Sequence, residues 1–146
     1  MMKWIFFIER ASLWRGMLCL TLALCLMTSC HEKEEEEVLD ITGSWTLVDL
    51  YEVGTRAVSI GSYEIDVTLV LTAGSTLTEG TFDLSQTVGE GRARNFSGTW
   101  TLAETTLSGN YSDGTSWGSS YEVLLSDDKS QLTLTSKGEV YVYKKQ

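Results

Sequence analysis

From Asp40 to the C-terminus, apolar and polar residues alternate in short stretches, and no sustained helical period competes with that pattern. Successive side chains of a strand point to opposite faces, so such alternation predicts strands with one buried face. In residues 63–71 the predicted buried face holds Tyr63, Ile65, Val67, Leu69 and Leu71. In residues 45–53 the same rule places Trp45, Leu47, Asp49, Tyr51 and Val53 on one face.

About eight such stretches follow one another, separated by turn sequences that include Asp113-Gly114, Asp127-Asp128-Lys129 and Lys137-Gly138. A meander of this kind leaves two exposed edges unless it closes into a barrel, which removes both. We therefore predict an all-β fold: a single antiparallel up-and-down β-barrel of about eight strands over residues 40–146. A sandwich is the alternative, but the sequence shows no long crossover connection.

The N-terminal 29 residues have a different character. Lys3, Arg10 and Arg15 precede the uncharged run "GMLCLTLALCLMTS", which is too short to span a bilayer as a helix. A basic flank, a short apolar core and small residues at its end are typical of a secretory signal peptide. Residues 1–29 are therefore predicted to be a cleaved leader, with a buried N-terminal helix as the alternative.

Cys30 follows in the context "LMTSC", which resembles the lipobox of bacterial lipoproteins. The resemblance implies that the Cys30 thiol receives a diacylglycerol, that the leader is cut before it, and that the new amine is acylated. Cys19 and Cys25 lie within the leader, so the mature chain would keep no free thiol. Several acyl chains together give stable membrane anchoring.

Residues 30–39 are predicted to be the lipidated cysteine and an acidic tether, because the like charges of Glu34–Glu37 repel one another. Lys33 followed by consecutive acids resembles the export signal of lipoproteins from the Bacteroidetes group. That resemblance implies an outer-membrane lipoprotein exposed on the cell surface, with the periplasmic face as the alternative. The chain has a net charge of −9, and loss of the leader makes it more negative, which argues against nucleic-acid binding.

Two segments of the predicted barrel echo each other: "TGSWTL" at 42–47 and "SGTWTL" at 97–102. A Gly-x-Trp at the start of the first strand resembles the lipocalins. The rest of the domain is similar to short lipocalin-like domains of Bacteroidetes lipoproteins, and "SSYEVLLSDDKSQLTLTSKGEVYVYKK" at 119–145 fits their ending. The resemblance implies a lipocalin-like barrel in which the first Trp packs at the bottom.

The echo is better explained by structure than by two binding sites, because the polar residues around it do not repeat. We predict that Gly43 and Gly98 make room where Trp45 and Trp100 pack closely against another part of the barrel. Trp100 and Trp45 are then structural residues. A ligand-stacking role for either is the alternative.

Trp117 differs, because it lies in the polar loop sequence "YSDGTSWGSSY". An aromatic residue in such a loop is a candidate ligand contact, and the alternative is that it folds back to plug the end of the barrel. Tyr63 and Tyr121, in the related segments "GSYEI" and "SSYEV", are the other candidate ligand-binding residues. The loops 54–61 and 89–94 are predicted to lie at the rim.

Catalysis has little support, since the single histidine, His31, lies in the tether and cannot serve a catalytic site in the domain. No cofactor and no metal site are predicted, and the aspartates of the turns do not fit a calcium-loop spacing. We predict a non-enzymatic lipoprotein that binds a small hydrophobic or amphipathic ligand. The alternative is a structural or protein-interaction module with a solid barrel core that serves a surface complex.

Overall fold

The computed structural model describes residues 37–56, 58–59 and 63–146, and the described part is entirely β-structure and connections. The predicted leader, Cys30 and the glutamates before Glu37 lie outside the described residues. The strands are β1 (Gly43–Glu52), β2 (Val58–Ser59), β3 (Ile65–Ala73), β4 (Glu79–Val88), β5 (Arg94–Ala103), β6 (Thr106–Tyr111), β7 (Tyr121–Leu125), β8 (Gln131–Ser136) and β9 (Glu139–Lys145).

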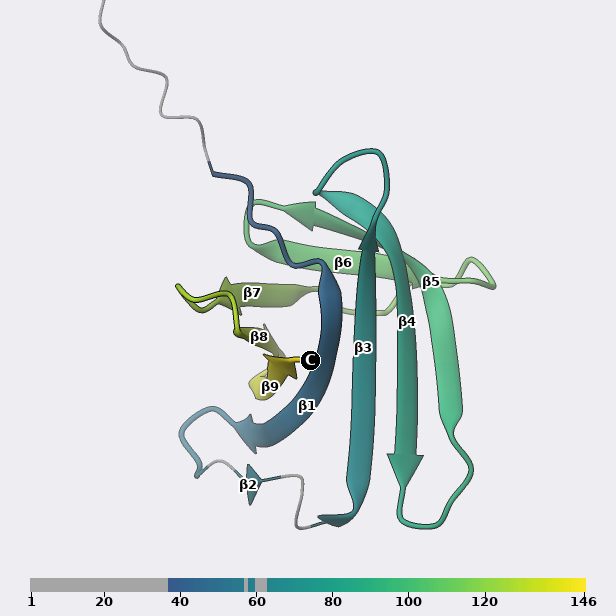
Figure 1. Cartoon of the computed structure of the whole chain (residues 1–146), viewed down its shortest axis with the longest axis vertical. Coiled ribbons are helices and arrows are strands. Elements are labelled where there is room, and N and C mark those ends of the chain that lie inside the picture. The colour runs from purple at the N-terminus through teal and green to yellow at the C-terminus, as the bar shows by residue number, and fades with distance from the viewer. Residues whose placement is uncertain (1–36, 57, 60–62) are drawn as a thin grey trace, which may run out of the picture. The chain divides into compact units, whose positions relative to one another are not determined.

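All strand pairs are antiparallel, and from β3 to β9 each strand pairs with the next one along the chain. β1 pairs with β3 on one side and with β9 on the other, which closes the sheet into a barrel (Figure 1). The two-residue β2 pairs with the last part of β1 and is an addition to the eight barrel strands. The predicted closed antiparallel barrel is thus confirmed.

In β3 the side chains point alternately into the barrel and toward solvent, as the alternating sequence predicts. Val67, Leu69 and Leu71 are buried in the barrel, whereas Asp66 is exposed on the outer face. The prediction fails at Tyr63, which is 61% exposed. The adjacent Glu64 has a φ of 52°, and this left-handed conformation interrupts the extended backbone before β3 begins at Ile65.

A β-bulge corrects the predicted alternation of β1. Leu47 pairs with Tyr143, but the next pair joins Asp49 to Val142, so Val48 is an extra residue in β1. Beyond the bulge, Leu50 rather than Asp49 shares the inner face with Leu47. The bulge therefore keeps a carboxylate out of the barrel and places an apolar side chain inside it.

The turns at the end of the chain follow the predicted sequences. Lys137 and Gly138 form a two-residue turn between β8 and β9, and both have positive φ, as a type I′ hairpin requires. The segment containing Asp128 connects β7 to β8, where the Asp128 carboxylate accepts hydrogen bonds from Ser126 and Ser130. Asp113-Gly114 belongs to a longer connection, residues 112–120, between β6 and β7.

The barrel has two distinct ends. The closed end is where β1 begins at Gly43 and β9 ends at Lys145; the open end is where β1 ends at Glu52 and β9 begins at Glu139. The described connecting residues at the open end are 53–56, 63–64, 89–93, 112–120 and 137–138. Within the described residues, no helix has the length and hydropathy needed to cross a membrane.

Candidate functional site

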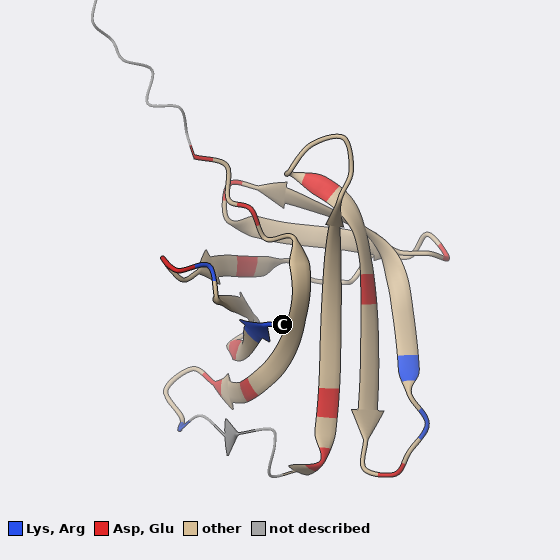
Figure 2. Ribbon diagram, in the orientation of Figure 1, with Lys and Arg blue, Asp and Glu red and all other residues tan. Residues whose placement is uncertain are grey.

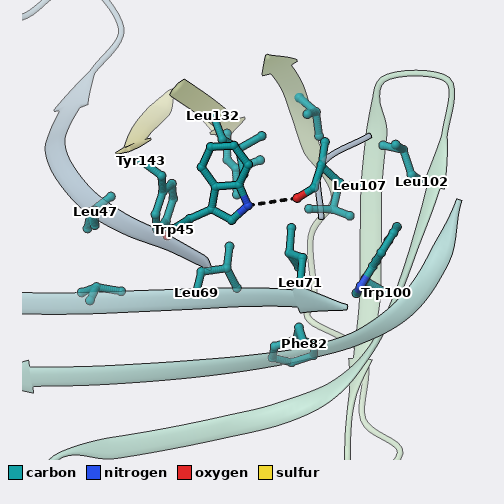
Figure 3. Packing of buried hydrophobic residues seen from close by; sticks show 14 residues of the cluster. Trp45, Leu47, Leu69, Leu71, Phe82, Trp100, Leu102, Leu107, Leu132 and Tyr143 are labelled. Carbon is teal, nitrogen blue, oxygen red and sulfur yellow. Dashed lines mark hydrogen bonds between the residues drawn. The ribbon is translucent and has the colours of Figure 1, made fainter. Parts of the chain in front are cut away.

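The closed end of the barrel is packed solid. Trp45, Ile41 and Leu132 have 0% exposure and Trp100 has 1%. Figure 3 shows the Trp45 indole pointing at the segment before β1, where its Nε1–H donates to the Ile41 carbonyl oxygen at 2.9 Å. Ile41 and Trp45 together fill this end of the barrel, in line with the packing role predicted for the first Trp.

The remainder of the barrel interior contains a cavity. A cavity of about 270 Å³ extends from the buried centre to the open end. Leu69, Leu71 and Leu107 at its inner end are buried, whereas Ile65, Leu84 and Gln86 are partly exposed, which places the opening at the open end. The aliphatic part of the lining comes mainly from β1 and β3 and includes Leu47, Leu50, Ile65, Val67, Leu69 and Leu71.

The aromatic part of the lining forms a continuous row of ring contacts. Phe82 lies 5.0 Å from Trp117 and 6.1 Å from Tyr111, measured between ring centroids. Trp117 is 6.0 Å from Tyr121, and Tyr121 is 6.1 Å from Tyr141. These contacts are edge-to-face, the favoured arrangement for aromatic pairs. The row therefore gives the cavity one rigid wall, built from β4, β6, β7, β9 and the connection 112–120.

Glycines lie beneath aromatic rings at three points of the barrel interior, two of them in this row. A Cβ at Gly109 would lie 2.5 Å from Trp117 Cζ2, so only glycine lets the indole cover β6 at that point. A Cβ at Gly98 would lie 2.9 Å from Phe82 Cε1, and one at Gly80 would lie 3.0 Å from Trp100 Cε2. Each of these glycines lies beneath an aromatic ring.

The prediction that Gly98 makes room for Trp100 is therefore wrong, because another glycine lies beneath that ring. Residues two apart on one strand share a face but do not cover each other, and it is Gly80 on the neighbouring β4 that pairs directly with Trp100. Gly98 pairs with Phe82 instead. Gly43 does lie near Trp45, but a Cβ there would first meet Lys145 Cε, at 3.1 Å, and its φ of 132° favours glycine by itself.

The polar groups of the lining are few and uncharged. The described residues around the cavity include no Lys, Arg, His, Asp or Glu; their polar side chains are Gln86 and the tyrosines, whereas the Nε1 of Trp117 is buried. Burial raises the pKa of Tyr121 and of Tyr143 above the ordinary value, so both phenols remain neutral. The pKa of Tyr141 is also raised, first by burial and then by Glu139, whose carboxylate accepts a hydrogen bond from the Tyr141 hydroxyl at 2.5 Å.

Charged residues lie outside the cavity, with both signs at the open end (Figure 2). Arg92 and Arg94 lie at the connection between β4 and β5, and Glu90 lies in the same connection. The open end thus has no field of a single sign, and the interior is apolar.

The structure brings together two of the three predicted ligand-binding residues. Trp117 and Tyr121 both line the cavity and contact each other, and Trp117 folds into the open half of the barrel rather than standing free in solvent. Tyr63 is exposed outside the lining. Of the two predicted rim loops, 89–94 is described throughout, whereas residues 57 and 60–62 of the other lie outside the described residues.

Sequence reasoning missed Phe82, Tyr111, Tyr141 and the aliphatic lining as site residues. The sequence did indicate that Tyr141 and Tyr143 share one face of a strand, because they lie two residues apart in the alternating segment "EVYVYKK", and both line the cavity. Phe82 gave no comparable signal, since its place in the wall depends on Gly98 in the next strand.

Comparisons with known proteins agree with this architecture. The family model of the lipocalin-like domain matches residues 41–143, nearly the whole barrel. A lipocalin-like protein from Bacteroides uniformis has a similar structure, with a TM-score of 0.55, 17% identity, and coverage of 74% of this chain and 100% of that one. A protein from Bacteroides eggerthii gives a TM-score of 0.52, 15% identity, and coverage of 73% and 100%.

Those identities establish a shared fold and no more, and among curated proteins none matches the sequence. The family match covers the closed end, the cavity and all barrel strands except the last two residues of β9. This chain belongs to the family of lipocalin-like domains.

Proposed function

We propose that this protein is a non-enzymatic binding protein that holds a small hydrophobic or amphipathic molecule in the open half of its barrel. The observation that carries the proposal is the cavity of about 270 Å³, which is lined by apolar and aromatic side chains and lies above a solidly packed end. Binding sites for small molecules are concave, mostly apolar and provided with a few polar groups, and this cavity has those properties. The alternative of a protein-interaction module assumed a solid core, and the cavity counts against that assumption.

Filling the cavity tests the proposal. Val67 lies in the lining on β3, whereas Val70 on the same strand belongs to the outer face. Val67→Phe should place a ring in the cavity and abolish binding, and Val70→Phe should leave binding unchanged. All barrel strands lie between Gly43 and Lys145, so a soluble form of residues 31–146 retains the whole barrel.

Binding is measured as quenching of tryptophan fluorescence across a panel of fatty acids, sterols, haem and neutral aromatic compounds. Trp117 is the reporter, since it lines the cavity. Binding by the wild type and by Val70→Phe, together with its loss in Val67→Phe, is the expected result. If no member of the panel binds, or if Val67→Phe binds as well as the wild type, the barrel interior is not a binding site.

We further propose that the barrel is attached to the outer membrane through lipid on Cys30 and is displayed at the cell surface. The support is the lipobox-like sequence before Cys30 and the acidic segment after it. Cys30→Ser should abolish incorporation of a clickable fatty acid, with Cys25→Ser as the matched control that keeps it. Labelling that persists in Cys30→Ser would refute lipidation at this residue.

A further inference from the structure

One basic side chain lies beside the opening of the cavity. The register between β4 and β5 pairs Gln86 with Arg94, and the register between β3 and β4 pairs Gln86 with Val67. Directly paired residues of antiparallel strands point to the same face of the sheet, with their Cβ atoms about 4.5–5.5 Å apart. Since Val67 and Gln86 line the cavity, Arg94 continues this inward-facing row at the rim.

Arg94 stands where the interior of the barrel meets solvent. Its side chain is exposed and is not part of the cavity lining. Figure 2 shows basic residues at the end of β5 that joins the connection to β4. Arg92 belongs to that connection, outside the paired part of β5. Among the described strand residues at the open end, Arg94 is therefore the one cation that the strand register directs toward the mouth.

Gln86 supplies a second donor next to this cation. Its side chain is half-buried and lines the cavity. The guanidinium presents five N–H donors in a planar fork that matches a carboxylate, and the Gln amide adds two more. A carboxylate that reaches this row can accept charge-assisted hydrogen bonds from Arg94 and a further bond from Gln86, and such bonds are stronger than those between neutral groups.

The acidic residues of the open end lie away from this row. Glu139 begins β9, the strand opposite β5 in the barrel, and its carboxylate accepts the hydrogen bond of the Tyr141 hydroxyl. Glu64 precedes β3, and its carboxylate lies near Gly89, where β3 and β4 end together. Glu90 lies in the turn after β4, beyond the last paired residues of β4 and β5. The mouth thus has a cation on the β5 wall and a carboxylate on the β9 wall, so an anionic head group is favoured at β5.

An apolar path joins Arg94 to the interior. Phe96 lies two residues further along β5 on the same face, and it pairs with the lining residue Leu84. The Phe96 ring lies 6.1 Å from that of Tyr111, measured between centroids, and Phe96 is 39% exposed. An apolar chain that leaves the cavity toward Arg94 would cover this ring and remove its surface from water, which is favourable.

We infer that the ligand is a compact amphiphile with a single carboxylate, bound with its apolar body in the cavity and its carboxylate at Arg94 and Gln86. The inference rests on the proposed function and adds to it the class of ligand, its orientation and the residue that recognises its head group. The body is compact because the cavity, at about 270 Å³, lies just below the roughly 300–1,000 Å³ of pockets for drug-sized ligands. Arg94 is the specificity-determining residue, and the apolar walls hold the body.

The test compares three probes with the same ten-carbon chain and different head groups: decanoate, decanol and decyltrimethylammonium. Dissociation constants are measured at neutral pH for residues 31–146, for Arg94→Gln and for Lys144→Gln. Lys144 is the matched control, because it is exposed on the outer face of β9 near the closed end and its substitution changes the net charge equally. Neither substitution removes a buried side chain, so both variants keep the barrel.

The wild type should bind decanoate more tightly than decyltrimethylammonium. Arg94→Gln should weaken decanoate about fivefold relative to decanol, which corresponds to about 1 kcal/mol, as expected for an ion pair at an exposed rim. Lys144→Gln should leave the binding of decanoate and of decanol unchanged.

The arginine Nε–H resonances give a second measurement on the wild-type sequence. Residues 31–146 contain three arginines, Arg56, Arg92 and Arg94, and Arg94→Gln identifies the signal of Arg94. Decanoate should shift that signal, and decanol should leave it in place.

The outcomes separate this inference from the proposed function. Equal effects of Arg94→Gln and Lys144→Gln on decanoate, an unmoved Arg94 resonance, or tighter binding of the ammonium probe would overturn the inference alone. The same holds if none of the three probes binds while another member of the fluorescence panel does. If no compound of either set binds the wild type, the proposed function falls with the inference.

Discussion

Replacing each tryptophan of the barrel by phenylalanine should separate the structural tryptophans from the one that faces the cavity. In Trp45→Phe the Ile41 carbonyl loses its donor in a fully buried position. Leaving a buried polar group unsatisfied costs about 1–3 kcal/mol. The smaller ring also buries about 50 Å² less apolar surface, which costs roughly 1 kcal/mol more. The free energy of unfolding should therefore fall by about 2–4 kcal/mol.

Trp117→Phe should have a much smaller effect. No hydrogen bond is lost, because the Nε1–H of Trp117 has no partner in the described structure. The substitution removes a buried, unsatisfied donor, and this gain offsets the loss of ring contact with Phe82 and Tyr121. The expected change in the free energy of unfolding is within about 1 kcal/mol. Trp100→Phe, which orphans the Thr81 carbonyl, should resemble Trp45→Phe.

The assay is urea unfolding of residues 31–146 followed by far-ultraviolet circular dichroism, which does not depend on the replaced fluorophores. Equal m values across the series would show that the variants unfold from equally compact states. The decisive quantity is the difference between Trp45→Phe and Trp117→Phe, expected to be about 2 kcal/mol or more. If the two variants are equally destabilised, Trp117 Nε1–H has a hydrogen-bond partner such as an ordered water, and the reasoning from its missing partner is refuted.

Three further predictions concern the barrel and its pH dependence. Gly98→Ala should destabilise the barrel by about 1–3 kcal/mol in the same urea assay, because the added Cβ would lie 2.0 Å from the Asn110 carbonyl oxygen. Thr99→Ala, at an exposed position, is the control. Equal effects of the two substitutions would show that the close contact is absent. Burial raises the pKa of Tyr143, so above about pH 10 this phenol ionises in the unfolded chain before it ionises in the folded one, and the free energy of unfolding falls by roughly 1 kcal/mol per pH unit. Tyr143→Phe should reduce the slope of stability against pH. An unchanged slope would contradict the raised pKa of Tyr143. Hydrogen bonds from Ser126 and Ser130 lower the pKa of Asp128 to about 2. The contribution of this carboxylate to stability is therefore present above about pH 4 and lost as the pH falls toward 2. The Asp128→Asn variant should lack this loss of stability between about pH 4 and pH 2 when it is unfolded at a series of acid pH values.

The strands could be predicted because they depend on local patterns, and the closure of the barrel could be predicted because an unclosed meander would leave two exposed edges. Alternation in residues 65–71 gives β3 directly, and the Lys137-Gly138 turn fixes the hairpin of β8 and β9. Trp117 could be singled out as unusual from its polar surroundings alone. The inferences about strands, turns and Trp117 needed nothing beyond neighbouring residues.

The bulge in β1 shows where local alternation is insufficient. Strict alternation places Asp49 with Trp45 and Leu47, and only the extra residue Val48 moves Leu50 to the inner face. The conflict was visible in the sequence, because an unpaired carboxylate is costly inside an apolar barrel. A single charged residue on an otherwise apolar face of a predicted strand therefore indicates a bulge. No sequence feature indicated that Glu64 has a positive φ, so the exposure of Tyr63 could not be predicted.

The partners of the glycines could not be predicted, since they depend on the register between strands. Gly98 lies two residues before Trp100, and the repeated Gly-x-Trp suggested that each glycine serves its own Trp. In the barrel each inner glycine lies beneath a ring from a different segment, such as Gly109 beneath Trp117. One repeated local sequence therefore marks a packed closed end at Trp45 and part of the cavity wall at Gly98.

The cavity lies in the half of the barrel where strand pairing is interrupted. β1 and β3 pair from Gly43 to Thr46 of β1, after which β1 pairs with β2 instead. β6 and β7 pair through Thr106 and Leu107, and toward the open end Trp117 lies over β6 through its bond to Gly109. Both interruptions occur on the side of the barrel away from Trp45, whereas β3–β4, β8–β9 and β1–β9 stay paired to the open end. Because β6 and β7 pair only through Thr106 and Leu107, the wall of the cavity beyond that point is completed by the Trp117 side chain and not by backbone pairing.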